Sequence, residues 1–108
     1  MTDAKWLSQA RRGILELCIL SMVSKKERHG YEIVKRLTSI GGLEVSAGTV
    51  YPLLTRLKRE GFLSSLLVES PHGPARRVYA VTPAGKKHLR NIEESWHELI
   101  EAVTRATE

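Results

Sequence analysis

Residues 45–61 read Val45-Ser46-Ala47-Gly48-Thr49-Val50-Tyr51-Pro52-Leu53-Leu54-Thr55-Arg56-Leu57-Lys58-Arg59-Glu60-Gly61, and this stretch decides the fold. At about 3.6 residues per turn it forms one helix with two different faces. The first face is apolar and carries Val50, Leu53, Leu54 and Leu57. The opposite face is small, hydroxylated and basic, and carries Gly48, Tyr51, Pro52, Thr55 and Arg59. Solvated helix faces are usually rich in Glu, Lys and Gln, so this face favours insertion into the DNA major groove, with a solvated face as the alternative.

Length and composition indicate a single globular domain. The chain has 108 residues, of which 42% are hydrophobic, which is enough for a core without disulfides or metal. The longest apolar run, residues 14–23, is interrupted by Glu16 and Ser21 and is shorter than the roughly 18 residues that span a bilayer. The N-terminus also lacks the pattern of a signal peptide, so we expect a cytoplasmic protein with no membrane partner. We interpret the single Cys18 as a buried structural thiol.

Charge is distributed unevenly along the chain. Residues 1–90 contain 16 Lys and Arg against 7 Asp and Glu, a net charge of +9, whereas residues 91–108 contain 1 against 5, a net charge of −4. The basic body favours polyanionic partners, because neutralising phosphates releases counterions and gives affinity that does not depend on sequence.

Two further helices are predicted before the central one. Residues 7–24 have a helical pattern that is apolar on most of its circumference after Ile14, so we expect this helix to lie between the core and another element, which could be a second subunit. A polar turn at 25–30 leads to a helix from about Gly30 to Ser39, which Gly41-Gly42 ends. Ser46 or Thr49 then caps the central helix.

Beyond residue 62 the periodicity changes from helical to extended. Residues 63–69 and 76–81 form two short strands, and residues 70–75 have the composition of a hairpin loop, which predicts a two-stranded wing. A last helix begins at once, because Thr82 is a good N-cap and Pro83 suits the first helical position. Its apolar residues alternate spacings of three and four, which is typical of a coiled-coil seam; they are Leu89, Ile92, Trp96, Leu99, Val103 and Ala106.

These elements predict a mainly α fold with a small β-hairpin. Residues 1–82 form a winged helix-turn-helix DNA-binding domain, and residues 83–108 form a C-terminal dimerisation helix. That helix is about 35 Å long at 1.5 Å per residue, more than a three-helix core can cover, so its seam needs a second chain. A homodimer places two recognition helices about 34 Å apart, which matches a palindromic operator on double-stranded DNA.

Six short segments together form a specific pattern: Gly13-Ile14-Leu15, His29-Gly30-Tyr31-Glu32-Ile33, Gly48-Thr49-Val50-Tyr51-Pro52-Leu53-Leu54, Leu57-Lys58-Arg59-Glu60-Gly61-Phe62-Leu63, Arg76-Arg77-Val78-Tyr79 and Val81-Thr82-Pro83-Ala84-Gly85. The pattern covers nearly the whole chain and resembles the PadR family of bacterial transcriptional regulators, in its smaller subfamily with a single short C-terminal helix. The resemblance implies a winged-helix DNA-binding fold, a homodimer and, usually, repression relieved by a small molecule. The loop 70–75 departs from the family's Gly- or Asn-rich basic turn because it carries two prolines.

The candidate DNA contacts are Tyr31, Ser46, Thr49, Tyr51, Pro52, Thr55, Arg56, Arg59, Arg76 and Arg77. The hydroxyl of Tyr51 can reach a phosphate or a base edge, and the resemblance implies a DNA contact there; core packing is the alternative. Tyr31 either donates to a phosphate or fills the core beneath the turn. Arg56 and Arg59 are phosphate contacts or solvated side chains. Neighbouring strand positions face opposite ways, so at most one of Arg76 and Arg77 is expected to meet DNA.

The candidate dimer contacts are Leu89, Ile92, Trp96, Leu99 and Val103. In one branch of the family a tryptophan in the corresponding helix lines a cleft for flat aromatic compounds, which implies that Trp96 is an effector contact; packing alone is the alternative. Trp6 is either an anchor for the first helix or a second wall of that cleft. The four histidines lack the spacing of metal ligands, so neither a metal nor another cofactor is predicted.

Two other function classes fit the sequence less well. No nucleophile elbow, phosphate-binding loop or zinc-protease motif occurs, so an enzyme is not predicted. A winged helix can also be a protein-interaction adaptor that binds no DNA, and the basic body and the Thr-Tyr-Arg face favour DNA over this alternative.

Overall fold

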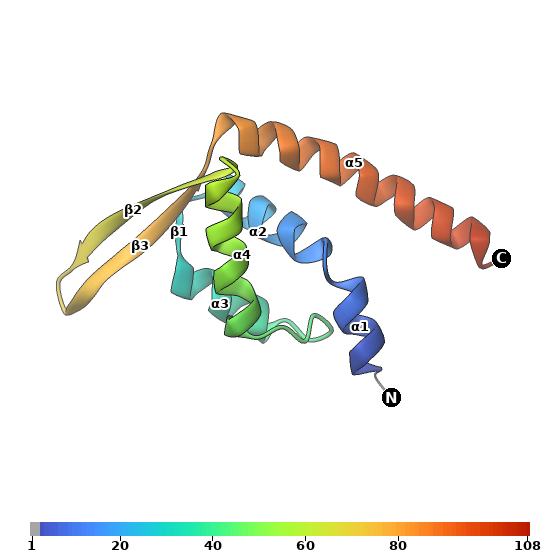
Figure 1. The fold of residues 1–108 in the computed structure, drawn as a ribbon, viewed down its shortest axis with the longest axis horizontal. Helices are drawn as coiled ribbons and strands as arrows, with labels where there is room; N and C mark the ends of the chain where they lie inside the picture. The colour runs from blue at the N-terminus through green and yellow to red at the C-terminus, as the bar shows by residue number, and fades with distance from the viewer. Residues whose placement is uncertain (1–2) are drawn as a thin grey trace.

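The computed structural model describes residues 3–108 and has five helices and three strands within that range (Figure 1). In chain order they are α1 (Ala4–Ala10), α2 (Ile14–Lys25), β1 (Arg28–His29), α3 (Gly30–Ser39), α4 (Ala47–Arg59), β2 (Leu63–Ser70), β3 (Gly73–Val81) and α5 (Pro83–Ala106). The strands form one antiparallel sheet in the order β1-β3-β2. The expected winged helix is therefore confirmed, with α4 in the position of the recognition helix.

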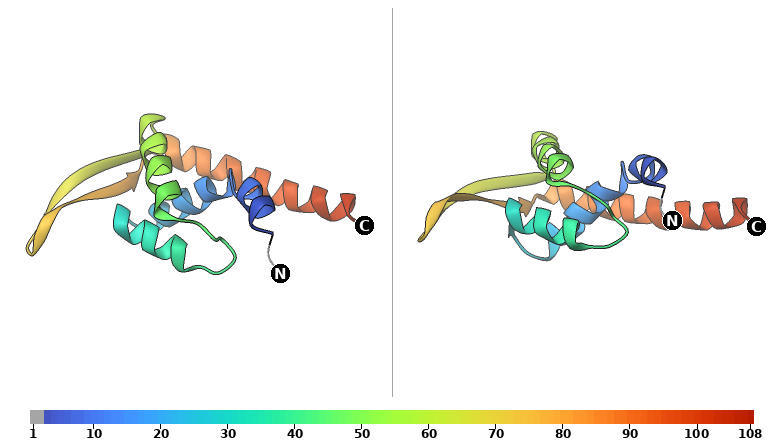
Figure 2. Two further views of the ribbon diagram at one scale, coloured as in Figure 1. Left: turned by 60° about the horizontal axis from the view of Figure 1, so that its bottom comes forward. Right: turned by 90° about the horizontal axis from the view of Figure 1, so that it is seen from below.

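The core lies where α2, α3 and α4 meet the base of the sheet and the first turns of α5. It is entirely apolar apart from one tyrosine, and its buried members are Ile19, Leu20, Val23, Ile33, Val34, Leu37, Val50, Leu54, Leu57, Leu63, Tyr79 and Leu89. From this base β2 and β3 extend away from the helices as a hairpin (Figures 1 and 2). The wing is thus an extension of the core sheet, which fixes its direction relative to α4.

Helix α4 has the two faces that the sequence predicts. Val50, Leu54 and Leu57 are fully buried, whereas the residues of the opposite face are exposed. The helix begins after the N-cap Ser46 and ends in a Schellman motif, in which the N–H of Phe62 donates to the carbonyl of Leu57 and the N–H of Gly61 to that of Lys58. Gly61 has a φ of +83°, which glycine adopts without strain.

The single helix expected over residues 7–24 is wrong. The chain leaves helical geometry at 11–13, which separates α1 from α2. Helix α1 contains no buried residue, lies at the edge of the molecule and leaves Trp6 62% exposed (Figure 2). Trp6 is therefore not part of the buried core of its own chain.

The wing also differs from expectation. Residues 28–29, expected in a turn, form β1 and pair with β3 at Tyr79 and Val78, so the sheet has three strands within the described residues. The loop is shorter than 70–75, because Ser70 already pairs with Gly73. Pro74 fits in β3 because the register shifts between Val68 and Ser70, and an irregular ladder tolerates a missing N–H.

Helix α5 begins where expected, with the Thr82 hydroxyl accepting the N–H of Gly85. Its first half packs against α2, and its C-terminal turns project beyond the rest of the chain (Figures 1 and 2). Leu89, expected in the dimer seam, is instead buried in the core of its own chain, because the first turns of α5 cover α2. Of the helices described, none is long and apolar enough to cross a membrane.

Candidate nucleic-acid interface

A hollow of about 520 Å³ lies where the start of α3, one side of α4 and the base of β3 meet. Its lining is aromatic and basic and consists of His29, Gly30, Tyr31, Tyr51, Arg76, Arg77 and Tyr79. Three elements that are separate in sequence therefore bring four of the candidate DNA contacts together. The exposed face of α4 continues from the edge of this hollow and carries Pro52, Thr55 and Arg59.

Gly30 allows the aromatic part of the hollow to form. A Cβ atom at this position would lie 3.3 Å from Cε2 of Tyr79 and 3.4 Å from Cε1 of Tyr51, so the two rings pack on the glycine. Tyr51 nevertheless remains 44% exposed. Tyr31 is 67% exposed, so the alternative that it fills the core is wrong. The side chain that fills the core here is Tyr79, and burial raises the pKa of its hydroxyl.

The two arginines of β3 both line the hollow, although they pair with neighbouring positions of β2. Arg77 lies opposite Leu67 and donates from Nη1 to Oγ of Ser65 at 2.9 Å, which holds its side chain along the sheet. Arg76 lies opposite Val68 and is exposed. Alternation along the strand therefore does not exclude either arginine from the hollow.

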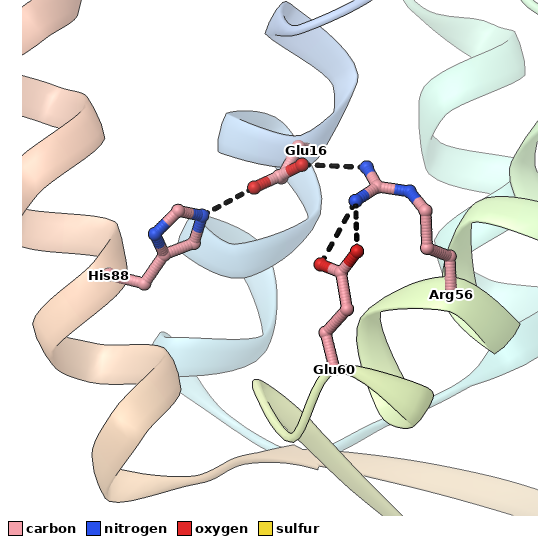
Figure 3. A network of polar contacts seen from close by, with 4 residues as sticks. All are labelled: Glu16, Arg56, Glu60 and His88. Atoms are coloured by element: carbon pink, nitrogen blue, oxygen red, sulfur yellow. Dashed lines mark hydrogen bonds and ion pairs between the residues drawn. The ribbon is translucent and has the colours of Figure 1, made fainter.

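Arg56 is placed differently from the other candidate contacts. Its Nη2 donates to one carboxylate oxygen of Glu16 at 2.7 Å, and its Nη1 lies 3.0 Å from both carboxylate oxygens of Glu60 (Figure 3). The second oxygen of Glu16 bonds to Nε2 of His88. Arg56 is thus ion-paired within its own chain, although its side chain remains 36% exposed.

Sequence reasoning missed the partners of Arg56. Glu16 is the acidic residue that interrupts the apolar run 14–23, and its side chain is only 15% exposed. A carboxylate in an apolar run needs a partner when it is buried, and this is the signal that could have found the network. Burial by itself would raise the pKa of Glu16, but the hydrogen bonds from Arg56 and His88 outweigh it, and the pKa lies below its ordinary value of 4.5.

Trp96 is half-buried and separates two further hollows. The first, of about 340 Å³, lies towards α3 and includes Cys18, Met22 and Glu93 in its lining. The second, of about 250 Å³, lies towards the break between α1 and α2 and includes Ile14 and Leu99. Trp6 lines neither hollow. Among the described residues, the structure contains no cluster of His, Cys, Asp and Glu suited to a metal.

Comparisons with known proteins agree on one family. Residues 19–91 match the model of the Transcriptional regulator PadR-like family. The chain is 37% identical over 99 residues to Transcriptional regulator Rv3488 of Mycobacterium tuberculosis, which covers 90% of this chain and 89% of that relative.

Two solved structures have the same fold over nearly their whole length. A PadR-like transcriptional regulator from Bacillus cereus, BC4206, is 35% identical with a TM-score of 0.80 and covers 93% of this chain and 97% of its own. A PadR family transcriptional regulator from Eggerthella lenta is 32% identical with a TM-score of 0.86 and covers 97% of this chain and 91% of its own. The family model spans most of the winged helix and the start of α5, and the chain therefore belongs to the PadR-like family of transcriptional regulators.

Proposed function

We propose that the chain is a homodimeric, sequence-specific regulator that represses transcription from a palindromic operator and is released by a small-molecule effector. The observation that carries the proposal is the continuous surface made by the exposed face of α4 and the aromatic and basic hollow beside it. A recognition helix beside a basic wing fits the major groove and the flanking phosphates. This role requires a cytoplasmic location, where the DNA is.

The proposed DNA contacts fall into two groups. Residues at the start and on the outer face of α4 meet the major groove; they are Ser46, Thr49, Tyr51, Pro52 and Thr55. Arg59, at the C-terminal end of the same face, meets a phosphate. Tyr31, Arg76 and Arg77 meet phosphates beside the groove, because all three line the hollow on the wing side of α4. Arg56 is left out of the proposed contacts, because its guanidinium is already paired with two carboxylates.

The proposed dimer uses the projecting part of α5. Leu99 and Val103 are 55% and 52% exposed and lie on one stripe of the helix with the half-buried Ile92 and Trp96. Apolar side chains at this spacing on a projecting helix suit a second copy of the same helix. Trp6, exposed on α1, is available to the same contact.

Trp96 is the proposed effector contact. Its ring lies between two hollows next to the projecting part of α5, and Glu93 beside one of them favours neutral or cationic aromatic ligands. A ligand that prefers the DNA-incompetent arrangement of the dimer would weaken operator binding. One planar aromatic compound is therefore expected both to quench Trp96 fluorescence in a Trp6→Phe background and to release DNA. Full release in Trp96→Ala would place the effector site elsewhere.

The test of DNA binding is fluorescence polarisation with the protein's own upstream region and with random DNA, over a series of salt concentrations. Tyr51→Phe keeps the ring on Gly30 and removes only the hydroxyl, so it is expected to lose more affinity for the operator than for random DNA. Arg59→Gln is the matched control. Losing a phosphate contact weakens binding to the operator and to random DNA alike, and it lowers the slope of log affinity against log salt concentration by about 1. A folded wild-type protein that binds neither DNA would favour the adaptor alternative.

A further inference from the structure

We infer that Glu16, Arg56 and His88 form a polar joint that holds α4 at a fixed orientation to α5, so that Arg56 acts on DNA binding by positioning the recognition helix. The inference rests on the proposed function and adds a route by which the arrangement of α5 reaches α4. We call this set of three residues the polar joint.

The polar joint connects three helices through one carboxylate. Glu16 belongs to α2, Arg56 to α4 and His88 to α5, and the two oxygens of Glu16 each serve one partner (Figure 3). The carboxylate is largely buried. If either partner is lost, one oxygen of Glu16 is left without its hydrogen bond, and water replaces that bond poorly. The orientation of α4 about α2 is thereby linked to the position of α5.

A second set of contacts locks the start of α5 to the end of α4. The ring of His88 stacks on Phe62, with centroids 4.1 Å apart and planes 9° apart. The Thr82 hydroxyl donates to the carbonyl of Gly61 at 2.6 Å, and the Thr82 N–H donates to the carbonyl of Phe62 at 3.1 Å. Gly85 packs so closely on Phe62 that a Cβ atom would lie 2.1 Å from that carbonyl oxygen. Contacts on both sides of His88 therefore oppose rotation of α5 relative to α4.

The charges of the polar joint argue against a phosphate contact by Arg56. The guanidinium of Arg56 faces two carboxylates, that of Glu16 in the polar joint and that of Glu60 next to it, so these three groups together carry no excess positive charge. A residue that does not neutralise a phosphate releases no counterion, and its removal leaves the salt dependence of binding unchanged. A positioning residue and a phosphate contact thus differ in a measurable quantity.

The polar joint also explains how one end of α5 can act on DNA binding. The first turns of α5 are fixed to α4, whereas its projecting turns carry the exposed stripe and lie beside the hollows around Trp96. A change in how this stripe meets a second copy would turn α4 with α5 as one body. Coupling between the dimer contact and the DNA contact requires an element whose position affects both. That element is α5.

The experiment is a double-mutant cycle of Arg56→Gln and Glu16→Gln, with operator affinity measured against salt concentration. Each single variant is expected to lose about tenfold in affinity with an unchanged salt slope, and the double variant to lose no more than either single one. Arg59→Gln, on the exposed face of the same helix, is the matched control and is expected to lower the slope by about 1. Circular dichroism and thermal unfolding confirm that each variant is folded at the assay temperature.

Three results would overturn the inference: a slope lowered by Arg56→Gln, additive losses in the double variant, or unchanged affinity in all three folded variants. Should Glu16→Gln fail to fold, His88→Ala takes its place in the cycle, because this side chain is 27% exposed and its loss leaves α2 intact. A wild type that binds no DNA would refute the proposed function, and amide hydrogen exchange then tests the polar joint alone. Faster exchange in both α4 and α5 of Glu16→Gln supports it, and a change confined to α2 overturns it.

Discussion

Glu16 shows how much one residue can depend on its surroundings. It lies on α2 between the buried Leu15 and Ile19, and its carboxylate forms hydrogen bonds with side chains from two other helices. Arg56 is 40 residues away in sequence and His88 is 72 residues away. No local pattern could identify these partners, whereas the need for partners was visible in the sequence. The position of a charge in an apolar run is thus predictive even where its contacts are not.

The pKa of Glu16 predicts a loss of stability in acid. Its folded-state pKa lies below the ordinary value of 4.5, so its carboxylate contributes stability above about pH 4.5 that is lost as the pH falls through the folded-state value. Urea unfolding at about pH 7 is expected to find the wild type about 1–3 kcal/mol more stable than Glu16→Gln. The difference should shrink steadily below about pH 4.5. An equal difference at about pH 7 and about pH 3 would contradict the ionised state assigned to Glu16.

Among the elements, the helices with clear capping residues or terminal glycines could be predicted from the sequence. The bounds of α3, α4 and α5 follow the caps and glycines that the sequence places there. The break between α1 and α2 lacks such a signal, since Gly13 is tolerated inside helices, and only the missing core beneath α1 reveals it. The two residues of β1 are too few to show a period, and they become a strand only because β3 lies beside them.

The junction between β3 and α5 predicts a severe cost for a small substitution. Gly85→Ala would place a Cβ atom 2.1 Å from the carbonyl oxygen of Phe62, so α5 or the turn after α4 must shift. We expect a loss of about 1–3 kcal/mol in the free energy of unfolding, measured by urea denaturation. Gly48→Ala is the matched control, because a Cβ atom there would make only an ordinary contact, 3.7 Å from Oγ of Ser46. The substitution is expected to be neutral or stabilising by about 0.4–1 kcal/mol. Equal effects of the two substitutions would argue against the close contact.

At the scale of the whole molecule, the chain is elongated, with extents of 55 × 34 × 20 Å. The projecting turns of α5 at one end and the wing at the other account for this shape (Figure 1). The sequence predicted the exposed face of α4 and the stripe on α5 because both depend on helical periodicity alone. It could not predict that Leu89 is buried while Leu99 is exposed, because this difference in burial depends on how far α2 extends beneath α5. The division at 82 and 83 stays a prediction.

The stripe on α5 predicts a dimer that one charge can break. Leu99→Asp would bury a carboxylate against a second copy of the helix, and we expect monomers by light scattering. Asn91→Asp adds the same charge on an exposed side of α5 away from the stripe and is expected to leave the mass unchanged. The Leu99 variant should keep its fold by circular dichroism, because this side chain lies outside the core. An unchanged dimer mass would remove the stripe from the proposed interface.

The central place of β3 in the sheet has a consequence for biosynthesis. Chains leave the ribosome N-terminus first, so α2, α3 and α4 emerge before β3, and β1 waits about 50 residues for its pairing partner. Until Tyr79 and Leu89 emerge, the apolar sides of α2 and α3 lack the side chains that complete the core. The nascent chain therefore exposes an apolar surface until β3 and the first turns of α5 have been translated. We therefore expect the core to form only after β3 and the start of α5 have left the ribosome, and not helix by helix as the chain emerges.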